Sequence, residues 1–159
     1  MTDVMDVIGG DLIFVARIAL AGLLAFLVGW EREAQGSTAG DRTHALVAIA
    51  TAAFTSIAVE KFPMDAGRII QGTITGVGFL GGGMILREAG RVRGLTTAAG
   101  VWAVAAIGIM IGAGEYVMGV SLGVLIVLVL AKERIPLVRR IGHTSSEQVL
   151  EKEESERGD

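Results

Sequence analysis

The stretch from Ile69 to Gly114 decides the fold class. It reads IIQGTITGVGFLGGGMIL, then REAGRVR, then GLTTAAGVWAVAAIGIMIGAG. The first and last of these pieces hold no Asp, Glu, Lys or Arg, whereas the short piece between them holds three arginines. A hydrocarbon core about 30 Å thick takes roughly 20 apolar residues in a helix. The stretch therefore predicts two membrane-spanning helices, Ile69–Leu86 and Gly94–Gly114, joined by a positively charged loop.

Three further apolar stretches lie outside this pair: Leu12–Trp30, Thr43–Val59 and Tyr116–Ala131. Only the first contains a formal charge, at Arg17. The whole chain of 159 residues is 52% hydrophobic and 19% charged, a balance that excludes an ordinary soluble enzyme and a disordered tail protein. We therefore expect an all-α, polytopic integral membrane bundle of about five transmembrane helices.

The distribution of Lys and Arg predicts the orientation of these helices. With Arg17 set aside, 11 of these residues fall on the side of the Glu31–Arg42 and Arg87–Arg93 loops and of the C-terminal tail, and two fall on the other side. Because cytoplasmic loops collect positive charge, the N-terminus is expected outside and the C-terminus in the cytoplasm. The expected division is a transmembrane domain over 1–131 and a short charged cytoplasmic tail over 132–159.

Several function classes lack any support in the sequence. The chain has no cysteine and two histidines far apart, so cysteine-based chemistry is excluded and a His-rich zinc site is not expected. A net charge of −3 gives no indication of nucleic-acid binding. No sequence motif of a hydrolase or metalloprotease occurs, and we expect that the protein is not an enzyme.

The glycine-rich segment Gly72–Gly83 holds six glycines within a predicted span, each of which weakens a helix by about 1 kcal/mol relative to Ala. Two interpretations stay open: close helix packing along Gly72/Gly76 and Gly78/Gly82, or a broken helix whose backbone lines an ion path. The candidate path residues are Gly76, Gly78, Gly81, Gly82 and Gly83. Gly108/Gly112 and Gly119/Gly123 repeat the spacing and are interpreted as helix-packing sites, homodimer packing included.

Charged residues at the span ends give the candidate polar sites. Arg17 is expected either to reach the headgroups or to pair with Asp11 or Glu115. Glu31 and Glu33 end the first span and Asp41 begins the second, which suits either a divalent-cation site or a capped, salt-bridged hairpin.

Two further polar groups lie where spans begin. His44 is expected to be either proton-sensitive or hydrogen-bonded at the membrane boundary. Thr96 and Thr97 are expected to cap the fourth span, or to hold a carboxylate of Glu31, Glu33 or Glu88 there.

Four ordered blocks of sequence resemble the MgtC/SapB family of membrane proteins across roughly Leu12 to Ala131. They are Gly29–Glu33, Ala39–Leu46, Gly76–Gly83 with Arg87-Glu88, and Val92–Ala99 with Trp102. The resemblance implies a bacterial inner-membrane protein with about five spans. The sequence departs from the family at Asp41, where an apolar residue is common. We also expect a short form without the C-terminal cytoplasmic domain that many members carry.

Residues that match the family's motifs, together with the end-of-span charges, form the predicted polar site: Glu31, Arg32, Glu33, Arg42, Thr43, Arg87, Glu88, Arg93, Thr96 and Thr97. Glu31, Glu33 and Glu88 are the predicted metal ligands, with Mg²⁺ as the candidate ion because the family is linked to growth in low magnesium. The expected function is divalent-cation homeostasis, by binding or moving an ion at the cytoplasmic end of the bundle. The expected partners are the lipid bilayer and a second copy of the chain in a homodimer. The alternative is a regulator that docks on another membrane complex, such as the ATP synthase, through Gly108/Gly112 and Gly119/Gly123.

Overall fold

The computed structural model describes residues 2–88 and 91–131, with the side chains of residues 2–8 and of Glu88 left out of that description. Of the described residues, 2–127 belong to one compact unit, and 128–131 fall outside it. The predicted tail over 132–159 lies outside the described residues, and the predicted domain boundary at 131 stays a prediction.

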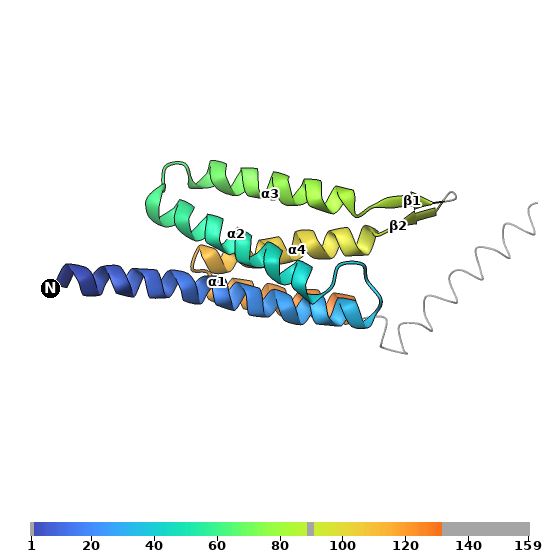
Figure 1. Ribbon diagram of the computed structural model, residues 1–159, viewed down its shortest axis with the longest axis horizontal. Coiled ribbons are helices and arrows are strands. Elements are labelled where there is room, and N and C mark those ends of the chain that lie inside the picture. The colour runs from blue at the N-terminus through green and yellow to red at the C-terminus, as the bar shows by residue number, and fades with distance from the viewer. Residues whose placement is uncertain (1, 89–90, 132–159) are drawn as a thin grey trace, which may run out of the picture. The chain divides into compact units, whose positions relative to one another are not determined.

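Five helices and one small β hairpin make up the described chain (Figure 1). In chain order they are α1 (Thr2–Ala34), α2 (Asp41–Lys61), α3 (Ala66–Gly83), β1 (Leu86–Glu88), β2 (Arg91–Arg93), α4 (Leu95–Gly112) and α5 (Tyr116–Leu130). Three of them contain segments long and apolar enough to cross a membrane, namely Gly9–Ala34, Asp41–Lys61 and Leu95–Gly112, and α5 is a shorter apolar helix. The predicted helical membrane fold with five helices is confirmed.

All five helices differ in their bounds from the predicted spans, and two of these differences affect the architecture. The first helix was expected from Leu12 but begins at Thr2. The third was expected to reach Leu86 but ends at Gly83, because the chain turns there into the antiparallel β1–β2 hairpin. Gly94, directly before α4, has a φ of +86°, and a Cβ at this position would collide with the Met84 carbonyl oxygen. A glycine is therefore required where the hairpin returns to the helix.

Helix α2 packs against both α1 and α4, and small residues line these contacts. A Cβ on Gly112 would lie 2.6 Å from the Ala52 carbonyl oxygen, and one on Gly108 would collide with the Thr51 hydroxyl. A Cβ on Gly119 would lie 2.5 Å from the Ile111 Cδ1. The predicted packing at these glycines is confirmed, but inside the chain. Gly108/Gly112 and Gly119/Gly123 are buried, so their predicted use as partner surfaces was wrong.

The glycine-rich segment forms an unbroken α-helix, so the broken-helix interpretation was wrong. The predicted pairs Gly72/Gly76 and Gly78/Gly82 also do not pack closely against another helix within the described chain. A Cβ added at Gly72, Gly76, Gly78, Gly82 or Gly83 would meet no atom within 4 Å, whereas Gly81 faces Ala98, 3.6 Å from its carbonyl oxygen. Most glycines of α3 therefore leave an open helix face.

Candidate functional site

One end of the bundle, which we call the hairpin end, holds the last turn of α1, the first turns of α2 and α4, and the β1–β2 hairpin (Figure 1). Polar side chains meet at this end. Gly29 allows this close approach, since a Cβ on it would lie 2.5 Å from the Asp41 Cα and 2.8 Å from the Gly40 carbonyl oxygen. The last turn of α1 is thereby held against the first turn of α2.

Glu31 and Arg32 are charged residues with little exposure at this end. Their side chains are only 12% and 11% exposed, and Glu31 Oε2 lies 3.8 Å from Arg32 Nη1. Gln35 Nε2 donates a hydrogen bond to Glu31 Oε1. Glu31 Oε2 and Arg32 Nε are buried with no hydrogen-bond partner in the described chain. Because a buried charged group without hydrogen bonds is costly, this pair favours an additional polar partner, such as water or an ion.

His44 is fully buried near the start of α2, at 0% exposure. Its Nδ1 lies 2.8 Å from the Gly40 carbonyl oxygen, so Nδ1 carries the proton and donates it. Nε2 is then an acceptor, and it has no hydrogen-bond partner in the described chain. The ring faces α4 at Gly100, where a Cβ would lie 3.3 Å from Nε2. The hydrogen-bonded interpretation of His44 is confirmed, and a further buried acceptor joins the cluster.

The start of α4 adds hydroxyl groups rather than a cap. The Thr97 Oγ1 lies 3.1 Å from the Ser37 Oγ, within hydrogen-bond distance, while Thr96 is exposed. Gly94, in the left-handed conformation, occupies the N-cap position without a side-chain cap. The predicted threonine cap was therefore wrong, and the described partner of Thr97 is Ser37 rather than a glutamate.

Glu33 points to a different place from Glu31, as expected for residues two apart on a helix. Its Oε2 accepts a hydrogen bond from the Asp41 backbone N–H at 3.3 Å. A hollow of about 340 Å³ is lined there by Glu33, Gly40, Asp41, Arg42 and Thr43. Gly40, not Asp41, occupies the N-cap position of α2, so the predicted Asp41 cap was wrong.

No group of three or more His, Asp or Glu residues able to hold a metal ion occurs among the described residues. Glu31 and Glu33 belong to two separate polar sites, and the Glu88 side chain is outside the description. The three-glutamate metal set therefore stays a prediction. The Arg87 and Arg93 side chains are exposed on the β hairpin, in contrast to Glu31 and Arg32, which have little exposure.

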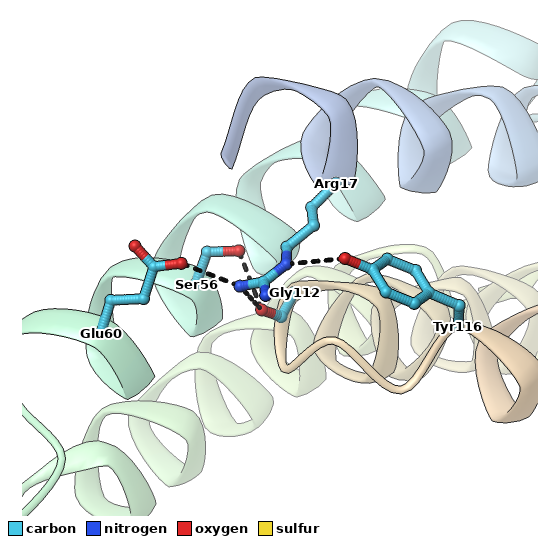
Figure 2. A network of polar contacts seen from close by, with 5 residues as sticks. All are labelled: Arg17, Ser56, Glu60, Gly112 and Tyr116. Atoms are coloured by element: carbon cyan, nitrogen blue, oxygen red, sulfur yellow. Dashed lines mark hydrogen bonds and ion pairs between the residues drawn. The ribbon is translucent and has the colours of Figure 1, made fainter. Parts of the chain in front are cut away.

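A second polar network, at the opposite end of the bundle, surrounds Arg17 (Figure 2). Arg17 Nη1 lies 2.9 Å from Glu60 Oε1 and donates to the Gly112 carbonyl oxygen at 3.4 Å, while Nε donates to the Tyr116 hydroxyl at 3.1 Å. Ser56 also donates to the Gly112 carbonyl oxygen, at 2.9 Å. The predicted partners Asp11 and Glu115 were wrong. Glu60 was missed because it follows the predicted second span and was assigned to a loop.

These features define a helical membrane protein with two polar networks, one at each end of a glycine-packed bundle. The sequence profile of the MgtC family matches residues 18–135, and the chain belongs to this family. No solved structure matches the chain.

Curated relatives extend the comparison. The chain is 39% identical over 126 residues to the "Putative magnesium transporter YhiD" of Escherichia coli K12, a match that covers 74% of this chain and 59% of that protein. It is 42% identical over 103 residues to "Protein MgtC" of Salmonella typhimurium, a match that covers 65% of this chain and 45% of that protein. It is 38% identical over 118 residues to "Protein SrpB" of Synechococcus elongatus, a match that covers 65% of each chain. The chain thus spans about half the length of the first two relatives.

Proposed function

We propose that this protein supports magnesium homeostasis in a bacterial inner membrane by binding a divalent cation at the hairpin end of the bundle. Membership of the MgtC family and the name of the relative YhiD, a putative magnesium transporter, support magnesium as the ion. The excess of Lys and Arg on the side of this end supports a cytoplasmic location for it.

The observation that carries the proposal is the Glu31 carboxylate. Its Oε2 is buried, accepts no hydrogen bond in the described chain and lies 3.8 Å from Arg32 Nη1, too far for a hydrogen bond. Mg²⁺ is commonly held by one or two carboxylates together with several of its own waters. A hydrated ion at Glu31 would supply the missing partner of Oε2.

The proposal is tested with the purified protein in proteoliposomes and in detergent. Magnesium flux and magnesium-dependent thermal stabilisation are measured for the wild type and for Glu31→Gln, which keeps the shape of the side chain and removes its charge. Glu115→Gln, an exposed carboxylate outside the cluster, is the matched control. We expect Glu31→Gln to abolish stabilisation by Mg²⁺ and Glu115→Gln to retain it.

The two measurements separate transport from regulation. Flux that is lost only in Glu31→Gln would establish an ion-conducting function. Stabilisation without flux would leave a magnesium-binding protein that regulates another membrane complex, with the ATP synthase as a candidate. If Glu31→Gln is stabilised by Mg²⁺ as well as the wild type, the site at Glu31 is excluded.

We also propose that the chain self-associates through α3. The glycines on its open face allow another helix to approach closely, which would offset their cost to helix stability. A docking regulator would use the same face, because the other small-residue pairs are buried in the fold.

A further inference from the structure

The β1–β2 hairpin exposes arginine side chains on both of its faces. Its register pairs Arg87 with Val92 and Glu88 with Arg91. Because directly paired residues share a face and successive residues alternate, Arg87 and Arg91 lie on opposite faces, and both side chains are exposed. The segment Arg87–Arg93 carries three arginines against one glutamate. The hairpin is therefore a compact, positively charged element.

Large apolar side chains flank these arginines. Ile85, Leu86, Val92 and Leu95 are between 41% and 58% exposed, although they stand beside charged residues at the ends of α3 and α4. A water-exposed loop gains nothing from such side chains, whereas the boundary between headgroups and acyl chains accommodates apolar and basic groups together. This composition favours a lipid surface over an acidic protein as the partner of the hairpin.

The length of the hairpin places its arginines at the depth of lipid phosphates. Helix α4 has 18 residues, or about 27 Å at 1.5 Å per residue, which nearly matches the roughly 30 Å hydrocarbon core. Each strand has three residues and extends about 10 Å beyond the helix ends. The headgroup layer on each side of a bilayer is roughly 5–8 Å thick. Arg87 and Arg91 consequently reach that layer and its outer edge.

We propose that the β1–β2 hairpin is a binding site for anionic phospholipid headgroups, with Arg87 and Arg91 each binding a lipid phosphate on its own face of the hairpin. A guanidinium group presents two N–H donors to a phosphate at once, which makes arginine well suited to this contact. The site is separate from Glu31 and requires no magnesium. Its occupation would stabilise the connection between α3 and α4.

The experiment measures lipid binding to the purified full chain in detergent, without Mg²⁺, by native mass spectrometry and by thermal stabilisation. The probes are phosphatidylglycerol, phosphatidylcholine of the same acyl chains, and inorganic phosphate. The test variant is Arg87→Gln with Arg91→Gln. The matched control removes two exposed basic groups at the opposite end, by Lys61→Gln with Arg68→Gln. Helical circular dichroism establishes that both variants are folded.

We expect phosphatidylglycerol to bind the wild type and the control more tightly than phosphatidylcholine does. Each arginine near an anionic surface contributes roughly a fivefold gain, so the hairpin variant should bind about 30-fold more weakly. Inorganic phosphate alone should not reproduce the stabilisation, because it lacks the acyl chains that the apolar side chains contact. Equal binding of both lipids, or equal losses in the two variants, would overturn the proposal. Stabilisation by inorganic phosphate to the same extent would also overturn it, in favour of a free-anion site.

Discussion

Arg17 joins three parts of the bundle through its guanidinium group. It pairs with Glu60 of α2 at 2.9 Å, and it donates to the Tyr116 hydroxyl and to the Gly112 carbonyl oxygen (Figure 2). Its side chain is only 17% exposed. A cation placed at the edge of the membrane is thereby neutralised by a carboxylate and bonded to two further oxygens, which lowers the cost of keeping it there.

At this scale the first prediction is that Glu60→Gln lowers stability by about 1–2 kcal/mol, because it removes the charge that neutralises Arg17 but leaves the other two hydrogen bonds. The partial exposure of Glu60 keeps the loss below that of a buried pair. Glu115→Gln, which changes a carboxylate that Arg17 does not contact, should be neutral. Reversible unfolding in mixed micelles measures both variants, and equal losses would contradict the assignment of Glu60 as the partner.

The partners of single polar residues could be predicted only in part from the sequence. Arg17 was recognised because a charge within an apolar run requires a partner, but the choice of Glu60 depends on the antiparallel register of α1 and α2. The same limit applies to Thr97, whose hydroxyl meets Ser37 from a different connection. Local sequence indicates which groups need partners, while helix register decides which groups meet.

At the scale of elements, glycines in α3 and α4 serve different purposes, and alanine substitution distinguishes them. The second prediction is that Gly112→Ala costs about 1–3 kcal/mol, because its Cβ would lie 2.6 Å from the Ala52 carbonyl oxygen and α4 would have to move away from α2. Gly78→Ala, with open space around the new methyl group, should raise stability by about 0.5–1 kcal/mol through helix propensity alone.

These two substitutions are compared in the same detergent, by the same unfolding measurement, under conditions where the protein is monomeric. A loss at Gly78 as large as that at Gly112 would show that α3 is packed against something on its glycine face. Repeating the pair in a lipid bilayer then tests the proposed self-association, since a packed α3 face should turn the gain at Gly78 into a loss.

The helices could be predicted from the sequence because each apolar run is long enough to satisfy its own backbone in lipid. The β hairpin could not be predicted in this way. Its strands have three residues each, and an alternating pattern that short cannot be distinguished from a charged loop. The only local indication was Gly94, which the structure places in a left-handed conformation. The exposed face of α3 was also not predictable, because GxxxG spacing does not indicate which helix, if any, packs against the glycines.

For the whole molecule, the two ends of the bundle differ in charge. The hairpin end carries Arg32, Arg42 and the β-hairpin arginines, whereas the 62–65 connection at the other end is flanked only by Lys61 and Arg68. This asymmetry is a property of the assembled bundle. It arises because the end of α1 and the beginnings of α2 and α4 lie together. Both proposed sites lie at the hairpin end, so the positive-inside rule predicts that both act on the cytoplasmic side.

The third prediction tests this orientation with single cysteines, which is straightforward because the chain has no cysteine of its own. Thr38→Cys lies in the exposed connection between α1 and α2, and Met64→Cys, at a side chain that is 95% exposed, lies in the connection between α2 and α3. A membrane-impermeant maleimide should label Met64→Cys in intact spheroplasts. It should label Thr38→Cys only in inverted vesicles or after permeabilisation. The reverse pattern would place Glu31 and the hairpin arginines outside the cell, where a cytoplasmic magnesium site and a cytoplasmic-leaflet lipid site are both impossible.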